Sequence, residues 1–400
     1  MVTNFKAKFL TAWAGMPRYV YALAAVAVLG LSAGVYRLYA GLGATTNLNS
    51  SFPWGVWISF DLTTVAFAGG AFTLATLVYV LHRHDLHAAV RPTVLLGLLG
   101  YSSVLVILLF DLGRWDRFWH FLVYPNLTSA LFEVSWCIAI YTTILAFEFS
   151  PVLLERFRNP RLLALVNKLT IPLVIAGITL SSMHQSSLGA LFVIAQPRVH
   201  PLWYSALQPE FFLLSSLGAG IATVLLGAFV SIRLFGQTLS QAVVEKLGRF
   251  MPWFLGAYLA LKLGELAFTG EFGLLFTSGW LSVLYAAELL IGAAIPLVLF
   301  SLKRVRTSRS ASVVAAVFVA AGIILNRFDM SWFALRPVNG LTYFPSWIEL
   351  ALLVGVGAGV LLVFTLLSHF LPVFAETVPV PMLVATSEAS QPVVAAAEAS

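Results

Sequence analysis

Four titratable residues lie inside long apolar stretches of the sequence. Asp61, Asp111, Glu133 and His184 fall in four consecutive stretches. If the chain crosses a membrane in alternating directions, each lies within about two helical turns of the same face. An ionisable group inside a span costs about 2.5 to 3.5 kcal/mol on insertion scales, so each is a candidate functional residue. Three carboxylates and an imidazole at one depth can hydrogen-bond a polar head group and exchange protons with it.

A structural role is the alternative for each of these residues. Asp111 and Arg114 are three positions apart, a spacing that allows an ion pair on one helix face. We favour that structural role for Asp111. Glu133 is flanked by apolar residues and His184 lies in a Met-His-Gln-Ser-Ser run, so we favour a functional role for both.

Further ionisable residues lie deeper in the apolar stretches. Glu148 follows Glu133 by 15 residues, which is about 22 Å along a helix and most of the way across a bilayer. Lys262 and Glu265 share a helix face and can form a buried pair, and Glu288 lies near the middle of a later stretch. Such a series is typical of a proton path, and equally of polar contacts that hold helices together. Both interpretations stay open.

The elements that must position these residues are membrane-spanning helices. The chain of 400 residues is 60% hydrophobic and only 10% charged, which excludes most soluble folds. Ten stretches have the length of about 20 residues that a span needs. They cover residues 17–39, 57–81, 91–113, 128–150, 168–190, 210–235, 249–270, 277–301, 311–327 and 346–372. None alternates with period two, so we predict an all-α polytopic membrane bundle of about ten transmembrane helices, built from two four-helix bundles plus extra helices.

The basic residues set the expected orientation. Of the 23 Lys and Arg, sixteen lie on the side shared by both termini, so both termini are expected in the cytoplasm. Because these residues cluster between apolar runs, the net charge of +6 reflects topology and not nucleic-acid binding. We predict a cytoplasmic N-terminus at 1–16, six spans at 17–235, four spans at 236–372 and a disordered cytoplasmic tail at 373–400. The first apolar stretch is expected to remain as an uncleaved span.

Cysteine and histidine usage limits the cofactors. The single cysteine, Cys137, excludes disulfides, CxxC metal sites, CxxCH haem attachment and iron–sulfur clusters held by this chain alone. Of the seven histidines only His184 is clearly within a span, so the bundle offers no pair of axial ligands for a b-type haem. We expect this chain to bind neither haem nor metal.

Aromatic residues gather in the outer loops. Residues 51–57, 114–120, 199–204 and 341–347 read SFPWGVW, RWDRFWH, VHPLWY and LTYFPSW. An interfacial aromatic belt explains single Trp residues. Whole segments punctuated by Pro and Gly instead favour folded loops that present a surface to a partner.

Several motifs resemble those of one family of membrane proteins. They are FPWGVWISFD at 52–61, VRP at 90–92, YS at 101–102, DLGR at 111–114, SALFE at 129–133, MHQSSLG at 183–189, VHPLW at 199–203, GEL at 264–266 and YFPSW at 343–347. The chain resembles the NrfD/PsrC family of quinone-interacting membrane subunits over residues 30–372. The later motifs are similar to its HybB-type branch, the membrane subunit of periplasmic-facing NiFe hydrogenases.

The resemblance implies a haem-free subunit in the bacterial cytoplasmic membrane that binds menaquinone or ubiquinone near the periplasmic face. Electrons would come from a periplasmic ferredoxin-like iron–sulfur subunit, itself reduced by the small and large subunits of a NiFe hydrogenase. The chain would then be a non-autonomous part of a hydrogen:quinone oxidoreductase. The alternatives are the same quinone role in a molybdopterin-type polysulfide, nitrite or sulfur-compound complex, and a secondary transporter.

The resemblance also implies roles for individual residues. Glu133 is expected to handle protons at the quinone and His184 to hydrogen-bond a quinone carbonyl, with Asp61 and Asp111 completing the catalytic set. The quinone-binding set is Trp54, Trp57, Gln185 and Arg114, and the proton-path set is Glu148, Lys262, Glu265 and Glu288. Relatives of this branch carry an acidic residue near the position of Gly227, so proton translocation by this chain is left open.

Overall fold

The computed structural model describes residues 15–157, 159–236, 239–336 and 340–374. Within these ranges the secondary structure is helical, apart from an isolated antiparallel bridge between Val199 and Leu335. Most of the predicted N-terminal segment 1–16 and nearly all of the predicted tail 373–400 lie outside the described residues. The division into six and four spans stays a prediction.

Long helical segments follow one another along the chain. They are α2 (Arg18–Ala40), α4 (Val56–Ala68) continued by α5 (Gly70–Ala75) and η1 (Thr76–Val80), α6 (Val90–Asp111), α8 (Ala130–Phe157), α9 (Pro160–Ile194), α10 (Gln208–Phe235), α11 (Gln241–Phe268), α13 (Trp280–Leu289) continued by η6 (Leu290–Ala294) and α14 (Ile295–Ser301), α16 (Arg309–Phe328) continued by η7 (Asp329–Phe333), and α17 (Trp347–Phe370). The short elements between them are α3 (Leu42–Thr45), η2 (His84–Ala89), η3 (Trp115–Arg117), α7 (His120–Val123), η4 (Gln196–Arg198), η5 (Glu271–Gly273), α12 (Leu274–Thr277) and α15 (Lys303–Arg306).

The predicted membrane bundle is confirmed. Among the described residues, nine helical segments are long and apolar enough to cross a membrane. The predicted seventh stretch, 249–270, falls almost wholly in the continuous helix α11, which ends at Phe268 and is not among these nine segments. The predicted ninth stretch, 311–327, is too short: the helix runs over Arg309–Phe333, because the π-helix η7 continues it past Phe328.

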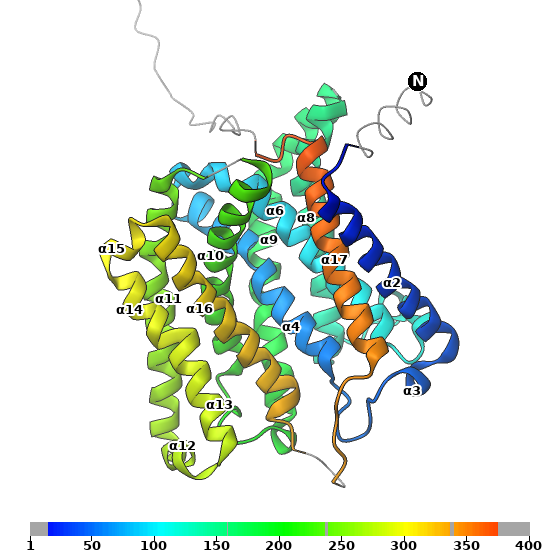
Figure 1. Ribbon diagram of the computed structural model, residues 1–400, viewed down its shortest axis with the longest axis vertical. Helices are drawn as coiled ribbons and strands as arrows, with labels where there is room; N and C mark the ends of the chain where they lie inside the picture. Colours follow the sequence, from blue (N-terminus) through cyan, green and yellow to red (C-terminus); the bar gives the residue numbers. More distant parts are fainter. Residues whose placement is uncertain (1–14, 158, 237–238, 337–339, 375–400) are drawn as a thin grey trace, which may run out of the picture.

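The long helices form two groups and an outer pair (Figure 1). The first bundle consists of α4 with α5, α6, α8 and α9, which pack on one another. The second bundle consists of α10, α11, α13 with α14, and α16. Helix α10 also packs on α9, α5 and α4, and so joins the bundles, while α2 pairs with α17 beside α6.

Two glycine pairs mark the closest helix crossings. Gly30 of α2 lies against Gly355 of α17, and Gly322 of α16 lies against Gly292 of η6, with no room for a Cβ at either crossing. Small residues suit such crossings, because lipid supplies no hydrophobic drive between helices and close backbone packing supplies the contact energy. These crossings fix the outer pair and the interior of the second bundle.

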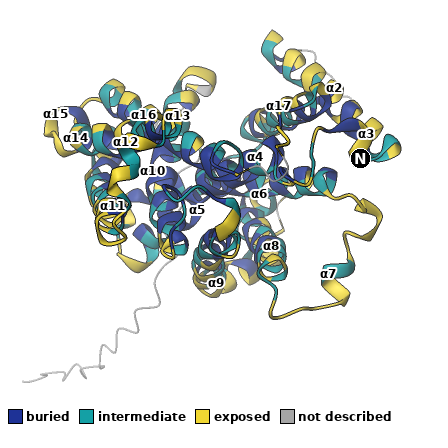
Figure 2. Cartoon of the chain, turned by 90° about the horizontal axis from the view of Figure 1, so that it is seen from below, coloured by how far each residue is buried: buried dark blue, intermediate teal, exposed yellow. Residues whose placement is uncertain are grey.

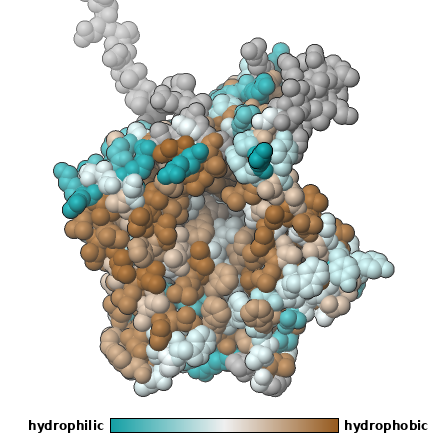
Figure 3. All heavy atoms as spheres, viewed as in Figure 1, coloured by the Kyte–Doolittle hydropathy of each residue, from teal (hydrophilic) through white to brown (hydrophobic). Residues whose placement is uncertain are grey.

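The outer surface matches a lipid environment. In Figure 3 hydrophobic residues cover the flank of the helices, and hydrophilic residues gather toward the upper end. In Figure 2, seen from below, the buried residues concentrate at the centre, on α4, α5, α6 and α10. Helix α4, which carries Asp61, lies in the most buried of the nine spans.

Candidate functional site

An apolar cavity of about 100 Å³ lies within the first bundle, near the end where α4 begins and α6 ends, which we call the outer end. Its wall is built from single faces of four helices and from one residue that precedes α4. The lining residues are Trp54, Ile58, Asp61, Leu62, Val65, Val104, Leu108, Leu131, Val134, Ile138, His184, Leu188, Leu191 and Phe192. On α4 the lining positions follow the spacing i, i+3, i+4, i+7, which is the stripe that one face of an α-helix presents.

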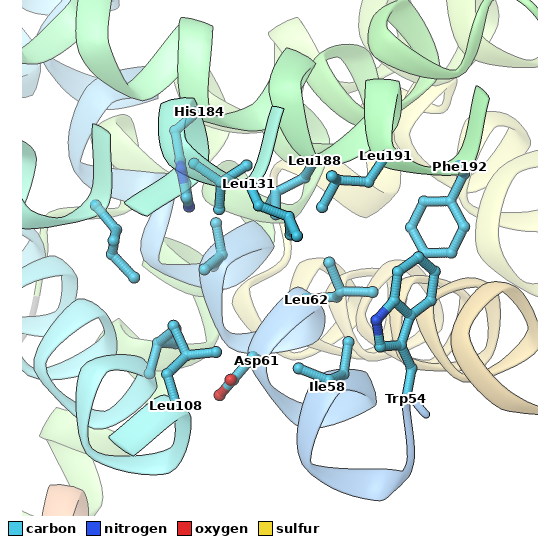
Figure 4. Close-up of a pocket in the computed structure, with 14 residues that line it drawn as sticks. Trp54, Ile58, Asp61, Leu62, Leu108, Leu131, His184, Leu188, Leu191 and Phe192 are labelled. Carbon is cyan, nitrogen blue, oxygen red and sulfur yellow. The ribbon is translucent and has the colours of Figure 1, made fainter. Parts of the chain in front are cut away.

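Two polar side chains face this apolar space without partners. Asp61 is 5% exposed and neither carboxylate oxygen has a hydrogen bond. His184 is 1% exposed and neither ring nitrogen has one. They come from opposite walls, α4 and α9 (Figure 4). Because an unpaired buried polar group costs about 1 to 3 kcal/mol, the pair indicates a site whose ligand supplies the missing partners.

Aromatic rings close one end of the cavity. The indole of Trp54 meets the ring of Phe192 edge-on, with centroids 5.4 Å apart (Figure 4). Trp54 precedes α4, and the Val56 amide at the start of that helix is held by a hydrogen bond from its N–H to the Tyr343 hydroxyl oxygen, at 2.9 Å. The far loop therefore fixes the entry of α4 and, with it, the aromatic end of the cavity.

Glu133 lies on the rim of the cavity and does not line it. Its Oε1 accepts a hydrogen bond of 2.5 Å from Ser187 Oγ, and Ser187 lies between His184 and Leu188, which both line the cavity. Glu133 itself is exposed in the first turn of α8. The Glu133–Ser187 contact thus joins the surface to the wall that carries His184.

Buried aromatic and polar groups continue inward from His184. The Tyr101 ring lies 5.6 Å from the His184 ring and 4.8 Å from the Tyr141 ring, measured between centroids. The Tyr101 and Ser181 side chains are both fully buried. Glu148 and Tyr141 both lie over Gly177, where an added Cβ would be 3.4 Å from Glu148 Oε1 and 3.5 Å from Tyr141 Cε2. Glu148 is therefore the innermost residue of the series that begins at His184 and includes Tyr101 and Tyr141.

The other predicted site residues lie outside the cavity wall. Trp57 is buried and its indole N–H donates to the Glu349 carbonyl oxygen at 2.9 Å. Gln185 is buried one residue after His184 and donates from Nε2 to the Val65 carbonyl oxygen at 3.0 Å. Both side chains hold helices in place beside the site.

Asp111 and Arg114 do not pair with each other. Arg114 forms an exposed ion pair with Asp116 at 2.8 Å, in the segment between α6 and α8. Asp111 ends α6, with one carboxylate oxygen buried and unpartnered. The favoured pairing of Asp111 with Arg114 is therefore wrong, because the chain turns away from the helix axis at Leu112, beyond the last turn of α6.

The second bundle contains a separate buried network around Glu288. Its carboxylate accepts hydrogen bonds from Trp203 Nε1 at 2.8 Å, Asn326 Nδ2 at 2.8 Å and Tyr258 Oη at 3.2 Å. Arg327 donates to Asn326 Oδ1 at 2.5 Å and stacks over the Phe212 ring at 3.7 Å. Among the described residues, no hydrogen bond joins this network to Glu148.

Lys262 and Glu265 do not form the buried pair that their spacing allows. The Lys262 ammonium is buried over the rings of Phe211, at 4.6 Å, and Tyr285, at 5.6 Å. Glu265 is half-exposed, and the ion pairs among the described residues include neither side chain. Aromatic faces thus take the place of the carboxylate as the neighbours of this cation.

Sequence reasoning did not single out several residues that the structure places in or beside these sites. Val104 and Leu108 follow Tyr101 of the YS motif on one face of α6, at the spacing i, i+3, i+7, so the helical period was a usable signal for them. Asp329 is fully buried with both carboxylate oxygens unpartnered, at the start of η7. Two residues on, Ser331 Oγ lies 2.7 Å from Ser59 Oγ of α4, where the bundles meet.

The loop ahead of α17 is locked to the start of α4. Tyr343 Oη donates to Glu349 Oε1 at 2.6 Å, and Glu349 Oε2 accepts from the Asn47 and Ser346 amides at 3.0 and 2.8 Å. Burial and the adjacent Glu349 carboxylate raise the pKa of the Tyr343 phenol, so it remains a hydrogen-bond donor. Glu349 therefore has a structural role, because its carboxylate holds the loop ahead of α17 and the segment before α4 together.

One loop stands away from the bundles. Residues 112–128 are largely exposed, and they include Trp115, Phe118, Trp119 and Tyr124. Figure 2 shows α7, which belongs to this segment, set apart from the other helices. The segment joins the end of α6 to the start of α8, and both of those helix ends line the cavity.

The model of the polysulphide reductase NrfD family matches residues 44–330, which hold both bundles and the cavity. The chain belongs to the NrfD family. This confirms the family that the motifs indicated. The NrfD-family match covers every residue of the cavity wall and the whole Glu288 network.

Relatives of this NrfD-family chain align over most of their length. It is 35% identical over 369 residues to a protein of Nitratidesulfovibrio vulgaris, covering 88% of this chain and 93% of the relative. It is 34% identical over 345 residues to the probable Ni/Fe-hydrogenase 2 b-type cytochrome subunit of Escherichia coli, covering 85% and 88%. It is 30% identical over 379 residues to the integral membrane subunit of menaquinone reductase of N. vulgaris, covering 87% and 89%.

Proposed function

We propose that the chain is the haem-free membrane subunit of a hydrogen:quinone oxidoreductase and that quinone is reduced in the cavity of the first bundle. The observation that carries this proposal is the facing pair of Asp61 and His184, buried and unpartnered in an otherwise apolar wall. A quinone ring fits that chemistry, because it is apolar on both faces and has carbonyl oxygens at opposite ends. The hydrogenase assignment rests on the relative in E. coli.

The cavity accepts the ring after a small opening at its mouth. Its volume of about 100 Å³ is smaller than the roughly 150 Å³ cavity that holds benzene in an engineered protein core. Leu131 lines the cavity and is 61% exposed, so this side chain marks the mouth. Outward movement of Leu131 admits the ring and leaves the isoprenoid tail in lipid.

The chemistry at the ring is a proton-coupled two-electron reduction. Two electrons and two protons convert the quinone into the quinol, each carbonyl oxygen becoming a hydroxyl. The Asp61 carboxyl delivers one proton to one carbonyl oxygen as the electrons arrive. His184 hydrogen-bonds the other carbonyl oxygen, which takes the second proton through one of two supply routes. The apolar wall excludes water and strengthens both interactions. Trp54 and Phe192 bound the ring at one end.

Proton supply has two candidate routes in this proposal. The outer route runs from water to Glu133, then through Ser187 to the wall of the cavity. The inner route runs from Glu148 past Tyr141 and Tyr101 to His184. The Glu288 network, with Lys262 and Glu265, belongs to the second bundle and serves its structure.

The electron donor is proposed to be a ferredoxin-like iron–sulfur subunit, itself reduced by the small and large subunits of a NiFe hydrogenase. It docks at the periplasmic face on residues 112–128, where the side chains of Trp115, Phe118, Trp119 and Tyr124 are exposed. Because the segment connects two cavity-lining helix ends, a docked subunit lies close to the quinone. Both termini then face the cytoplasm, with the basic ends of the helices.

A b-type haem does not fit the residues that line this cavity. The name of the relative in E. coli includes a b-type cytochrome, which needs axial ligands from facing helices. His184 faces Asp61 across a cavity whose wall contains no second histidine and no methionine. No step in the proposed mechanism passes through a haem.

The competing proposal keeps the quinone site and changes the catalytic partner to a molybdopterin-type complex. The relative named as the integral membrane subunit of menaquinone reductase, at 30% identity, supports the quinone site and does not name a hydrogenase. Relatives with a descriptive name are redox-complex subunits, so the transporter alternative gains no support from them. The proteins that co-purify with the chain from membranes separate the two redox assignments.

The function is tested on the complex purified with its native partners. We expect an iron–sulfur subunit and a NiFe hydrogenase to co-purify, and hydrogen to reduce a soluble menaquinone analogue. Glu133→Gln is expected to slow that reduction by at least about tenfold, because positioned acid–base groups contribute about 100-fold or more.

Glu210→Gln is the matched control, because Glu210 is also an exposed acid in the first turn of its helix. Full activity of the Glu133→Gln complex would remove the outer proton route. Purification of the chain as a solitary oligomer would overturn the function itself.

A further inference from the structure

A second and larger cavity lies at the other end of the bundles, away from the quinone site. It has a volume of about 550 Å³, within the range of about 300 to 1,000 Å³ that is usual for ligand pockets. It is bounded by the inner ends of α6, α10, α11 and α17. The lining residues are Asp85, Ala88, Pro92, Thr93, Leu96, Val224, Gly227, Ala228, Ser231, Leu239, Ser240, Val243, Phe364 and Phe374.

The walls of this inner cavity are graded in polarity. Leu96, Val224 and Phe364 are apolar, whereas Asp85 in η2 and Ser240 just before α11 are exposed at its mouth. Figure 3 shows the flank hollowed between the two bundles, below the hydrophilic upper end. An apolar interior with a polar mouth at the membrane surface has the polarity profile of a lipid molecule.

Basic side chains surround the mouth. Asp85 is paired with Lys246 at 2.6 Å and with Arg83 at 3.3 Å. Arg309 donates to the Leu239 carbonyl oxygen at 2.6 Å, and among the described residues it has no acidic partner. Three cations around one carboxylate leave the mouth with a net positive charge.

We propose that the inner cavity binds an anionic phospholipid of the cytoplasmic leaflet. The phosphate lies among Arg83, Lys246 and Arg309, and an acyl chain lies between α6, α10 and α17. Basic pockets between transmembrane helices on this side of a membrane bind such head groups. The site is independent of the quinone site, since the two cavities share no lining residue.

Gly227 gives the cavity its width. A Cβ added there would lie 3.3 Å from Leu96 Cδ1, on the opposite wall. Gly227→Leu therefore fills the space between α10 and α6 without changing any charge. Gly357→Leu is the matched control, because an added Cβ there meets no atom within 4 Å.

The test uses the complex reconstituted into nanodiscs that contain equal amounts of phosphatidylglycerol and phosphatidylcholine. Native mass spectrometry then identifies the lipid that stays bound. We expect phosphatidylglycerol to be retained in preference to phosphatidylcholine. Arg309→Gln should lower that preference about fivefold, since a basic side chain near the surface contributes about 1 kcal/mol. Lys168→Gln, at an exposed basic residue of α9, should leave it unchanged.

Gly227→Leu should abolish retention of the lipid, and Gly357→Leu should keep it. Equal retention of the two lipids by the unmodified complex would overturn the proposal. So would retention by Gly227→Leu, or a bound quinone in place of phospholipid. Hydrogen-dependent quinone reduction is measured in parallel, so a failure of the proposed function is seen separately.

Discussion

In the first bundle the Asp61 carboxylate is buried without a hydrogen-bond partner, whereas in the second bundle the Glu288 carboxylate accepts three hydrogen bonds. Both are acids inside spans, and sequence position alone does not distinguish them. The two acids differ in whether their hydrogen-bonding capacity is used within the chain. A buried polar network whose members all have partners stabilises the fold, whereas a buried group without partners indicates a site where a ligand supplies them. Asp329 also lacks partners, at the start of η7, which continues α16. The second bundle therefore also contains one unpartnered acid, two residues before the contact of Ser331 with Ser59 of α4.

The largest expected effect comes from breaking the complete network. Glu288→Ala leaves the N–H groups of Trp203 and Asn326 and the hydroxyl of Tyr258 buried without their acceptor. Removing one partner of a buried charged network costs about 3 to 5 kcal/mol, so little folded protein is expected. Yield in the membrane and thermal unfolding in detergent measure this. A Glu288→Ala protein with unchanged stability would contradict the structural role.

Asp61→Asn tests the incomplete site. The amide keeps the size of the side chain but cannot deliver a proton to the quinone, so the turnover number is expected to fall about 100-fold. Stability should stay the same, because the carboxylate makes no hydrogen bond to lose. The assay is hydrogen-dependent quinone reduction by the intact complex.

Glu155→Gln is the control for that variant, since Glu155 is an exposed acid of α8 that is paired with Arg91 at 2.6 Å, away from the cavity and from residues 112–128. It should keep full turnover. If Asp61→Asn instead unfolds the protein while keeping its turnover number, the contrast between the two bundles fails.

His184→Phe sharpens the comparison with a smaller change. The ring keeps most of the volume but loses its hydrogen bond to a quinone carbonyl, which contributes about 0.5 to 1.5 kcal/mol. We expect the KM for quinone to rise about three- to tenfold with little change in stability. A lower melting temperature at unchanged KM would show that His184 is a packing residue.

Trp54 and Trp57 give the smallest expected effect and the finest contrast. Trp54→Phe keeps an aromatic ring at the end of the cavity, so the KM should rise only about twofold. Trp57→Phe leaves the Glu349 carbonyl oxygen without its donor and should cost about 1 kcal/mol of stability at constant KM. Steady-state kinetics and thermal unfolding of the two variants, measured side by side, separate these outcomes. Identical behaviour of the two would contradict their different positions.

The fold was predictable from the sequence because ten apolar stretches and their basic flanks constrain a membrane chain tightly. The π-helix after Phe328 was not, since it continues a helix through Asp329 and Ser331, residues that look like the start of a loop. The depth of Asp61 and His184 follows from helix direction and length. That both side chains lack hydrogen-bond partners depends on how each helix is rotated about its axis. Only the packing of the helices sets that rotation.

Because packing sets which residues meet, the sequence also could not give the neighbours of the other site residues. Lys262 and Glu265 have a spacing that allows a pair, yet Lys262 lies on aromatic rings contributed by α10 and α13. Trp54 and Trp57 are three residues apart in one motif, yet they lie on opposite sides of the entry to α4. Periodicity gives the face of a helix, but the neighbour on that face comes from distant parts of the chain.

The glycine contact between α2 and α17 has a consequence for the order of assembly. These helices are the first and last described spans, and each depends on the other for close packing at Gly30 and Gly355. During synthesis α2 enters the membrane long before its partner exists. Helix α2 therefore has to be stable as a single helix in lipid until α17 has been synthesised and inserted. The close packing at Gly30 and Gly355 is thus completed only after α17 has entered the membrane.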